Sequence, residues 1–443
     1  MGGARRRALT GALAWPAHLG AIVSVAFAMV AAPPLTAAQT TWHMQPAVSL
    51  GLGYDDNVTL DPDDPISSFG ASLSAAVRGE RATENAAMGL RAGLNLDIYF
   101  DERDLDTFAG LIGWDATRFS ERSRWRLDTR LSTESTLTSE TATTGVTGLN
   151  EQQLQIAVEP SWAYRLSERA IVDVSAGFEG TFYEDSGDLG LNDYYTGTLS
   201  LGGDYRLSER AGTTATFSYE RYDARGIASE AETLGALFGG DYQLSQTTAL
   251  GALAGVRRTE VTRSAAPNGL RVTEDSTGPT YSVWLGKQLA RGGSFQLEAL
   301  REVTPSGTAE VLDTTSLAFW LSYPFSERWG LDLRLQGYRN RDPSGEASTS
   351  DRKYADGDLT LSYALSEAWR LTLGYRYRWQ EYDELSRSAE GNTVTLTLAW
   401  TGRAPEGAPG GWAPRPGQAG RNLPRSPDSR LGIQTQLDAA MWQ

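Results

Sequence analysis

The sequence predicts an all-β fold: a transmembrane, antiparallel, up-and-down β-barrel of about 18 strands, with about 16 to 18 fitting the pattern. Three observations lead to this fold class. Apolar and polar residues alternate over segments of roughly ten to thirteen residues, which suits a tilted crossing of a bilayer. Short and longer connections follow one another in turn, as in barrels with short periplasmic turns and longer extracellular loops. An aromatic residue closes the apolar face before the short turns, at the level of a membrane interface.

The composition excludes several other classes of protein. The 443 residues include 47 Gly, 13 Trp and 18 Tyr, but no Cys and only two His. The chain is too polar to supply the apolar spans of about 18 residues that a bundle of membrane helices needs. With no thiols and two histidines, we expect no metal site and no cofactor. The net charge of −15 argues against nucleic acid as a partner.

Residues 1–38 have the features of a signal peptide. Three consecutive arginines (5–7) precede an apolar run (19–32) that is too short to span a bilayer, and small residues (36–38) form a cleavage site. A retained membrane anchor is the alternative, which the prolines around the apolar run disfavour. We therefore expect an exported protein.

A short motif, aromatic-X-Leu-Ser-Glu or a close variant, recurs along the chain. Its first copy starts at Tyr164, and the aromatic residues of successive copies are 41, 37, 81 and 40 residues apart. A period near 40 residues also fits a propeller or a solenoid. The long alternating segments favour a hairpin turn at the periplasmic rim, with its aromatic in the headgroup layer. The predicted aromatic girdle consists of Tyr164, Tyr205, Tyr242, Tyr323, Tyr363 and Trp400.

The barrel is expected over residues 39–400, and its strands follow from alternation. From Met88 to Phe100, for example, every second residue is apolar and most of the others are small or polar. An even strand number places both chain ends of the barrel in the periplasm, and closure requires the first and last strands to pair. The predicted strands are 44–54, 67–79, 86–100, 106–119, 124–137, 153–165, 170–183, 193–206, 211–222, 232–243, 248–260, 277–288, 294–303, 314–323, 329–340, 353–364, 369–382 and 392–400.

The last predicted strand ends on Trp400 and resembles the terminal signal that the outer-membrane assembly machinery recognises in its substrates. That signal usually stands at the extreme C-terminus, whereas here residues 401–443 follow. They are rich in Pro, Gly and Arg and cannot bury a core, so we expect a disordered periplasmic tail.

The first strand runs into Gly53-Tyr54-Asp55-Asp56-Asn57-Val58. With the Ser-Glu-Arg turns and the chain length, this start resembles the outer-membrane β-barrel porins associated with exopolysaccharide gene clusters, including PEP-CTERM/exosortase systems. The resemblance covers roughly residues 42–400 and implies a conduit or accessory channel for a surface polysaccharide. The Tyr-Asp-Asp-Asn string is compatible with a loop cation site, but an ordinary turn explains it better.

The inward positions of the strands should line an aqueous lumen. Acidic side chains there outnumber basic ones by eight to six, which predicts a weak preference for cations. The row Arg370, Arg376 and Arg378 either holds an anionic substrate or only pairs with neighbouring strands, and inward aromatics such as Tyr183 and Trp284 either stack on sugars or fill space. The lumen candidates are Asp173, Glu179, Asp204, Glu220, Asp241, Asp332, Asp356 and Asp358, together with Arg91, Arg130, Arg334, Arg370, Arg376 and Arg378.

We expect no enzymatic activity. The only histidine beyond the leader, His43, falls at the periplasmic start of the first strand, and carboxylate pairs such as Asp356 and Asp358 are common in polar lumens. The sequence thus predicts a porin-like barrel of the bacterial outer membrane that conducts exopolysaccharide or small solutes. The alternative is a plugged barrel with a structural or adhesive role. Its expected partners are outer-membrane lipid and lipopolysaccharide, the assembly machinery and polysaccharide.

Overall fold

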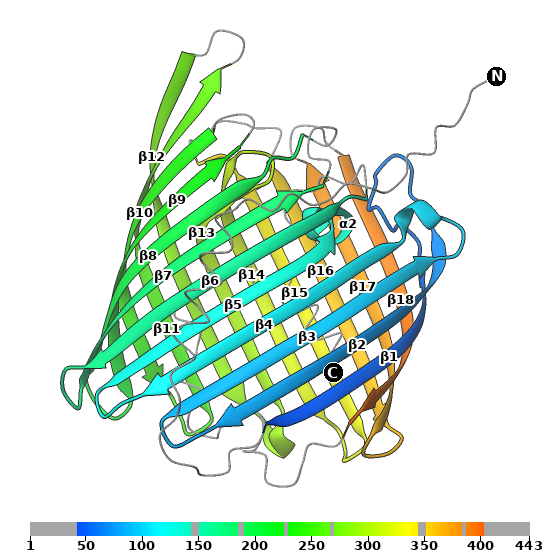
Figure 1. Ribbon diagram of the computed structural model, residues 1–443, viewed down its shortest axis with the longest axis horizontal. Helices are drawn as coiled ribbons and strands as arrows, with labels where there is room; N and C mark the ends of the chain where they lie inside the picture. The colour runs from blue at the N-terminus through cyan, green and yellow to red at the C-terminus, as the bar shows by residue number, and fades with distance from the viewer. Residues whose placement is uncertain are drawn as a thin grey trace. The chain divides into compact units, whose positions relative to one another are not determined.

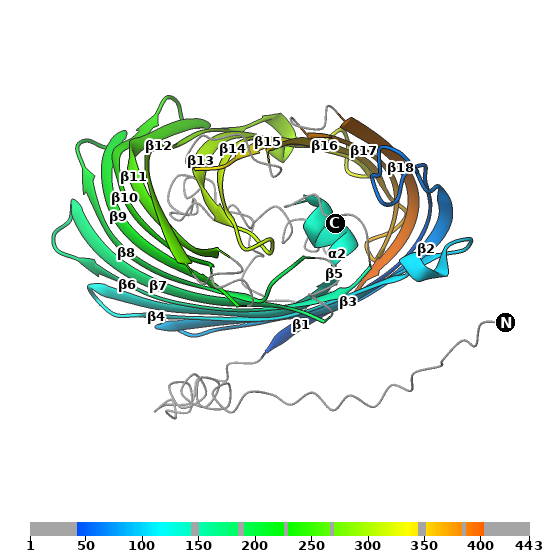
Figure 2. The ribbon, with the colours of Figure 1, turned by 90° about the horizontal axis from the view of Figure 1, so that it is seen from above.

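A computed structural model describes residues 42–142, 150–184, 190–225, 229–265, 270–343, 351–382 and 387–402. These residues form one antiparallel sheet of 18 strands in which each strand pairs with its neighbours in sequence. The sheet closes on itself, because β1 also pairs with β18, and Figures 1 and 2 show the resulting barrel. Among the described residues, no helix is long and apolar enough to cross a membrane.

The observed strands match the predicted ones in number and order. They are β1 (His43–Asp55), β2 (Ser68–Ala82), β3 (Ala86–Tyr99), β4 (Thr107–Phe119), β5 (Ser123–Ser135), β6 (Gln152–Arg165), β7 (Ala170–Tyr183), β8 (Tyr194–Arg206), β9 (Ala211–Ala224), β10 (Ser229–Gln243), β11 (Thr248–Ala265), β12 (Leu270–Gln288), β13 (Ser294–Pro305), β14 (Val311–Pro324), β15 (Trp329–Arg341), β16 (Arg352–Ala364), β17 (Trp369–Tyr382) and β18 (Arg387–Thr401). The described residues also form the short helices η1 (Arg103–Leu105), α2 (Thr136–Ala142) and η2 (Ala290–Gly292). The fold class predicted from alternation is therefore confirmed.

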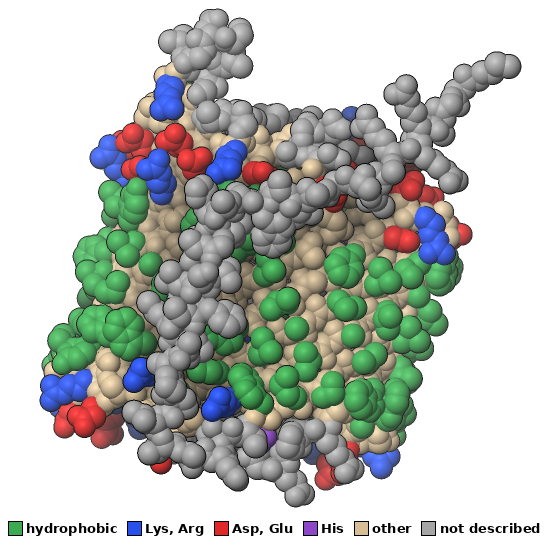
Figure 3. Space-filling model, viewed as in Figure 1, with side chains coloured by type: hydrophobic (Ala, Val, Ile, Leu, Met, Phe, Trp, Pro, Cys, Tyr) green, Lys and Arg blue, Asp and Glu red, His purple; other side chains and the backbone are tan. Residues whose placement is uncertain are grey.

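Apolar side chains cover the outer surface of the barrel. Every second residue of a strand points outward and remains exposed, as Leu50, Phe217 and Val256 do with 57%, 60% and 61% of their surface. In Figure 3 these side chains form a band across the wall, with charged residues above and below it. An apolar band between charged rims is the surface of a barrel that crosses a lipid bilayer. The chain is thus a transmembrane β-barrel of the bacterial outer membrane.

The recurring serine explains the short turns. In the turn after β6, the backbone N–H groups of Arg169 and Ala170 donate hydrogen bonds to Ser167 Oγ at 3.2 and 3.1 Å. Ser208 makes the same two bonds in the turn after β8. A serine hydroxyl satisfies turn N–H groups that the strands leave unpaired, which explains why the motif recurs in hairpins at this end of the barrel. Ser326 and Ser366 repeat the pattern. The turn between β12 and β13 contains the short helix η2 instead.

Several boundaries differ from the predicted ones by a few residues, and three of these differences change how a connection is described. The predicted strands 248–260 and 277–288 leave a long loop between them, expected over residues 262–275. In the structure, β11 extends to Ala265 and β12 begins at Leu270, because the two strands remain paired beyond the apolar band. Residues 136–137, expected in a strand, begin helix α2 instead. Thr401 and Gly402 belong to the barrel, since the N–H of Gly402 donates to Pro46 O at 2.8 Å. The predicted signal peptide and the tail from residue 403 lie outside the described residues.

The predicted girdle residues lie near the ends of β6, β8, β10, β14, β16 and β18. Tyr205 and Tyr242 expose 46% and 44% of their surface there. Tyr164 stacks on Trp162 with ring centroids 5.7 Å apart, and Tyr363 contacts Trp329 at 4.7 Å. Tyr323 packs edge-on against Phe325, and Trp400 lies opposite Trp369 in the β17–β18 register.

Candidate functional site

Three connections fold toward the lumen from the extracellular ends of the strands. They are α2 after β5, the hairpin tip 306–310 between β13 and β14, and residues 56–67 between β1 and β2. Figure 2, a view along the barrel, shows α2 and the β13–β14 hairpin inside the ring of strands. The lumen is therefore narrowed by parts of the chain itself, which the strand pattern did not predict.

Helix α2 is fastened to the wall on both sides. At its start, the N–H of Thr136 donates to Glu151 O at 2.9 Å, and the N–H of Leu137 donates to Ser135 Oγ at 3.1 Å. On the far side, Tyr183 on β7 donates its hydroxyl proton to Glu140 Oε1 at 2.7 Å. These bonds hold the helix across the lumen face of β5 to β7.

The β13–β14 hairpin leaves the wall of the barrel. Pairing between β12 and β13 stops at Tyr281 and Arg301, although both strands continue beyond this point. At the hairpin tip, Ser306 O accepts the hydroxyl proton of Tyr222 at 2.6 Å, and Gly307 O accepts the N–H of Asn192 at 2.7 Å. The tip thus contacts β9 and the residues that precede β8, which lie four to five strands away from β13 around the ring. A buried apolar cluster forms there, made of Tyr183, Leu191, Tyr194, Tyr222, Ala224, Ala231, Val261, Ala309 and Val311.

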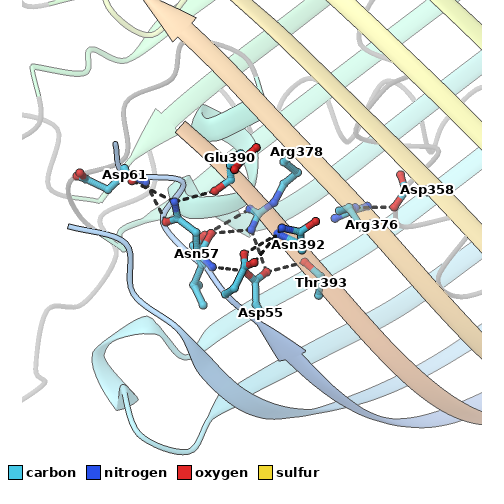
Figure 4. Close-up of polar contacts among 11 residues, drawn as sticks. Asp55, Asn57, Asp61, Asp358, Arg376, Arg378, Glu390, Asn392 and Thr393 are labelled. Atoms are coloured by element: carbon cyan, nitrogen blue, oxygen red, sulfur yellow. Dashed lines mark hydrogen bonds and ion pairs between the residues drawn. The ribbon is translucent and has the colours of Figure 1, made fainter. Parts of the chain in front are cut away.

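The connection after β1 packs against the lumen face of β17 and β18, as Figure 4 shows. Arg378 on β17 is the centre of this contact. Its Nη2 donates to Asp55 Oδ2 and to Asn57 O, both at 2.9 Å. Leu60, which is fully buried, contacts Tyr354 across the same junction. The Tyr-Asp-Asp-Asn string thus ends β1 and enters a turn that the ion pair between Asp55 and Arg378 anchors.

Five of the eight predicted acidic residues lie on four consecutive strands. Asp173 and Glu179 are on β7, Asp204 on β8, Glu220 on β9 and Asp241 on β10. Each alternates with the outward apolar residues of its strand, so the five share the lumen face. Glu179 accepts a hydrogen bond from Gln155 at 3.1 Å, and Asp204 accepts one from Thr214 at 2.8 Å. We call these five residues the acidic wall.

The predicted arginines lie elsewhere in the ring, and three of them are on β17. Arg376 Nε donates to Asp358 on β16 at 2.5 Å, and Arg378 is paired with Asp55. Arg370 lies opposite Ala364 near the periplasmic end. Arg376 and Arg378 are thus ion-paired with residues of β16 and β1. We call Arg370, Arg376 and Arg378 the arginine row.

The remaining candidates complete this distribution. Arg334 on β15 lies opposite Asp358 in the register and donates to Gln336 at 2.6 Å. Asp332 lies on the same strand opposite Thr360, and Asp356 on β16 opposite Arg378. On the other side of the β1–β18 closure, Arg91 lies on β3 and Arg130 on β5.

The two groups of charges lie opposite one another. In the ring of 18, β8 and β17 are nine strands apart, so the acidic wall faces the arginine row across the lumen. No Lys or Arg occupies an inward position of β7, β9 or β10, and on β8 only the terminal Arg206 does. An ion in the lumen therefore lies between a wall of carboxylates and a wall on which arginines stand beside Asp358 and Asp55.

A buried arginine that the sequence did not single out supports the inward connections. Arg352 on β16 has no exposed surface and donates from Nε and Nη2 to Gln380 Oε1 at 3.1 and 2.6 Å. Its Nη1 donates to Tyr338 Oη at 2.9 Å, and Gln380 Nε2 donates to Leu60 O at 2.7 Å. Because Arg352 starts its strand, its sequence position resembled that of a loop residue. Its charge is enclosed by Gln380 and by the rings of Tyr338, Tyr354 and Tyr382, and Gln380 connects it to Leu60 of the inward connection.

Within the residues that the structure describes, no group of three or more His, Asp or Glu side chains is arranged to hold a metal ion. Trp284 and Tyr382 lie at inward positions of β12 and β17, with Arg352 positioned 5.9 Å from the ring centre of Tyr382. The polar groups on the lumen face are thus mainly carboxylates, amides, hydroxyls and guanidinium groups.

Comparison with solved structures finds other barrels. OccAB3 from Acinetobacter baumannii is similar over 82% of this chain and 99% of its own, at 13% identity and a TM-score of 0.41. The outer-membrane protein OpdK from Pseudomonas aeruginosa matches 81% and 98% of the two chains, at 11% identity and a TM-score of 0.39. The siderophore receptor PiuA from A. baumannii matches 83% and 82%, at 10% identity and a TM-score of 0.42. No family model and no curated protein sequence matches the chain.

Proposed function

We propose that the protein is a channel that carries charged, hydrophilic solutes across the outer membrane. The acidic wall opposite the arginine row is the observation that carries this proposal. Opposite charges on facing walls orient and select a solute in a narrow lumen, whereas a barrel with only a structural role has no need of them. The acidic wall adds a preference for cations, because it contains five carboxylates on neighbouring strands.

We further propose that the natural cargo is a surface exopolysaccharide, as the resemblance of the first strand and the turns implies. The arginine row supports an acidic polysaccharide in particular. A guanidinium group binds a carboxylate through two parallel hydrogen bonds, and successive arginines on one strand match the repeated acid groups of such a chain. In this proposal, Asp358 and Asp55 release Arg376 and Arg378 in part when the cargo arrives.

A closed barrel with a structural role is the second candidate function. The specific observation in its favour is that three connections fold inward and bond to the wall or to one another. The two candidate functions predict different ion currents. The purified full-length protein, inserted into planar bilayers, should show stable open steps, with a reversal potential that indicates cation preference in a salt gradient. A correctly folded barrel that carries no current would contradict the channel and support the structural role.

The cargo is tested by blocking that current. Acidic oligosaccharides added to one side should interrupt the current more often than neutral ones of equal length. Replacing Arg376 by Gln should reduce the frequency of block by the acidic oligosaccharides. The matched control is Arg258→Gln, since Arg258 forms an exposed pair with Asp275 on the outer side of β11 and β12. Equal block by acidic and neutral fragments would argue against the polysaccharide while leaving the channel in place.

A further inference from the structure

Two glutamates under the lumen helix are buried together. Glu134 on the lumen face of β5 exposes 6% of its surface, and Glu140 on α2 exposes 2%. They are close enough for the charge of Glu140 to act on Glu134. Removing a carboxylate from water is unfavourable by several kcal/mol, and a second carboxylate nearby adds repulsion. A fold that places both there needs something to offset their charge.

The neighbouring strands supply oxygen atoms to the same place. Gln153 on β6 lies directly opposite Glu134 in the strand register and exposes only 5% of its surface. Its Oε1 is buried and has no hydrogen-bond partner. Tyr183 on β7 lies opposite Gln153 and donates its hydroxyl proton to Glu140. Glu134, Gln153 and Tyr183 therefore form one row across three strands, with Glu140 above them on α2.

Positive charge is scarce around this row. Arg130, four residues before Glu134 on the same face of β5, is the guanidinium group that acts on Glu134. No Lys, Arg or His occurs between Arg130 and Arg165, so neither α2 nor its connection to β6 contributes a base. Thr181 on β7 and Thr196 on β8, in register with Gln155 and Glu179, lie on the lumen face below the row and are buried hydroxyls whose oxygens have no partner. The pocket thus combines excess negative charge with unused oxygen atoms.

We propose that Glu134, Glu140 and Gln153 Oε1 bind a divalent cation, Ca²⁺, which fastens α2 to the inner wall. Carboxylate and amide oxygens are the ligands of hard cations, and Ca²⁺ tolerates an irregular set of six to eight oxygens that includes water. Mg²⁺ fits less well, because it requires near-ideal octahedral geometry and loses its water reluctantly. The bound ion offsets the two buried carboxylates and ties the helix to the strand that precedes it. The site concerns the position of α2 and does not depend on the proposed cargo.

Terbium binding tests the site directly, since Tb³⁺ occupies Ca²⁺ sites and is excited through a nearby tyrosine, here Tyr183. The full-length protein, folded in detergent and treated with a chelator, is titrated with Tb³⁺ and then with Ca²⁺ or Mg²⁺. We expect a saturable Tb³⁺ signal that Ca²⁺ displaces at lower concentration than Mg²⁺. Glu134→Gln and Glu140→Gln should each weaken binding by about tenfold or more.

The matched control is Glu159→Gln, which removes another carboxylate from the lumen face of β6, six residues from Gln153. It should bind Tb³⁺ like the unmodified protein. Heat-modifiable migration of each variant in gels verifies that the barrel has formed. Absence of saturable binding, or binding that Glu134→Gln and Glu140→Gln leave unchanged, would overturn the proposal. Because this measurement needs no ion current, its failure is distinct from a failure of the channel.

Discussion

Arg257 and Asp313 form a buried ion pair, with Nη2 and Oδ2 2.7 Å apart, although their strands should turn these side chains to opposite sides of the wall. Arg257 points into the lumen from β11. Asp313 has the same parity on β14 as Leu317, which is exposed to lipid with 55% of its surface. The pair is possible because β12 and β13 separate beyond Tyr281 and Arg301, so that Asp313, at the end of the β14–β15 ladder, reaches the inner face of β11. Arg301 also binds Asp313, at 2.7 Å.

Replacing Asp313 by Asn should release the β13–β14 hairpin. The change leaves Arg257 buried without its partner, and breaking a buried ion pair in this way costs about 3 to 5 kcal/mol. We expect faster hydrogen exchange in residues 302–314 and larger or noisier current steps, as the hairpin moves away from the lumen. The control is Asp275→Asn in the exposed pair with Arg258, which should change neither quantity. Unchanged exchange in Asp313→Asn would show that the apolar cluster alone holds the hairpin.

Neutralising the acidic wall should reduce the preference for cations. The triple change Asp173→Asn, Glu179→Gln and Glu220→Gln removes three of its five carboxylates while the side chains keep their size. The cation-to-anion permeability ratio, obtained from the reversal potential in a salt gradient, should fall by roughly twofold or more. Glu230→Gln with Glu232→Gln is the control, because these glutamates pair with Arg221 on the outer face. An unaltered ratio in the triple variant would place the selectivity elsewhere.

The two faces of the last strand should respond differently to charge. Leu396 exposes 49% of its surface to lipid, whereas its neighbour Thr397 points inward. Leu396→Arg near the middle of the apolar band should lower the free energy of unfolding by about 2 to 4 kcal/mol. Thr397→Arg should have a smaller effect, since water solvates the new charge. Urea unfolding in lipid vesicles, followed by tryptophan fluorescence, measures both, and equal losses would contradict the assigned faces.

Removing residues 403–443 should leave a barrel that still inserts and still shows heat-modifiable migration. The closing ladder between β1 and β18 runs from Asp55–Thr393 to Ala47–Thr401 and needs nothing beyond Gly402. A shorter chain that ends at Thr393 loses almost the whole ladder and should not fold, because the open strand edges lack partners in lipid. Western blots of outer-membrane fractions measure how much of each shortened chain is inserted. Failure of the longer variant to insert would show that the tail takes part in assembly.

The number of strands, and whether each side chain points to the lipid or to the lumen, could be predicted because both depend on local chemistry. A membrane-crossing strand must bury its backbone groups in ladders and place every second side chain in lipid, so alternation such as that from Met88 to Tyr99 is visible within one segment. The serine turns are local too, since Ser167 bonds to residues two and three positions further on.

The extra length of β11 and β12 and the helix α2 were not visible in this way. Beyond the apolar band, a strand no longer needs apolar residues on its outer face, and Arg258, Glu260 and Thr262 occupy those positions in β11. Helix α2 has only seven residues, Thr136 to Ala142, and depends on Tyr183 and Glu151 for its position. A segment that is held in place by residues far away in the chain carries no periodic pattern of its own that would reveal it.

By itself, the sequence determined that this protein is a closed barrel with polar residues inside, because lipid imposes one period on every strand. Only the tertiary structure decided that the acidic wall faces the arginine row, that Asp313 turns inward to Arg257, and that Glu134 shares a pocket with Glu140. Each of these relationships joins residues that are far apart in the chain, or a strand residue and a residue of the connection that folds back over it. They depend on closure of the ring and on packing inside it, which alternation along a strand does not encode.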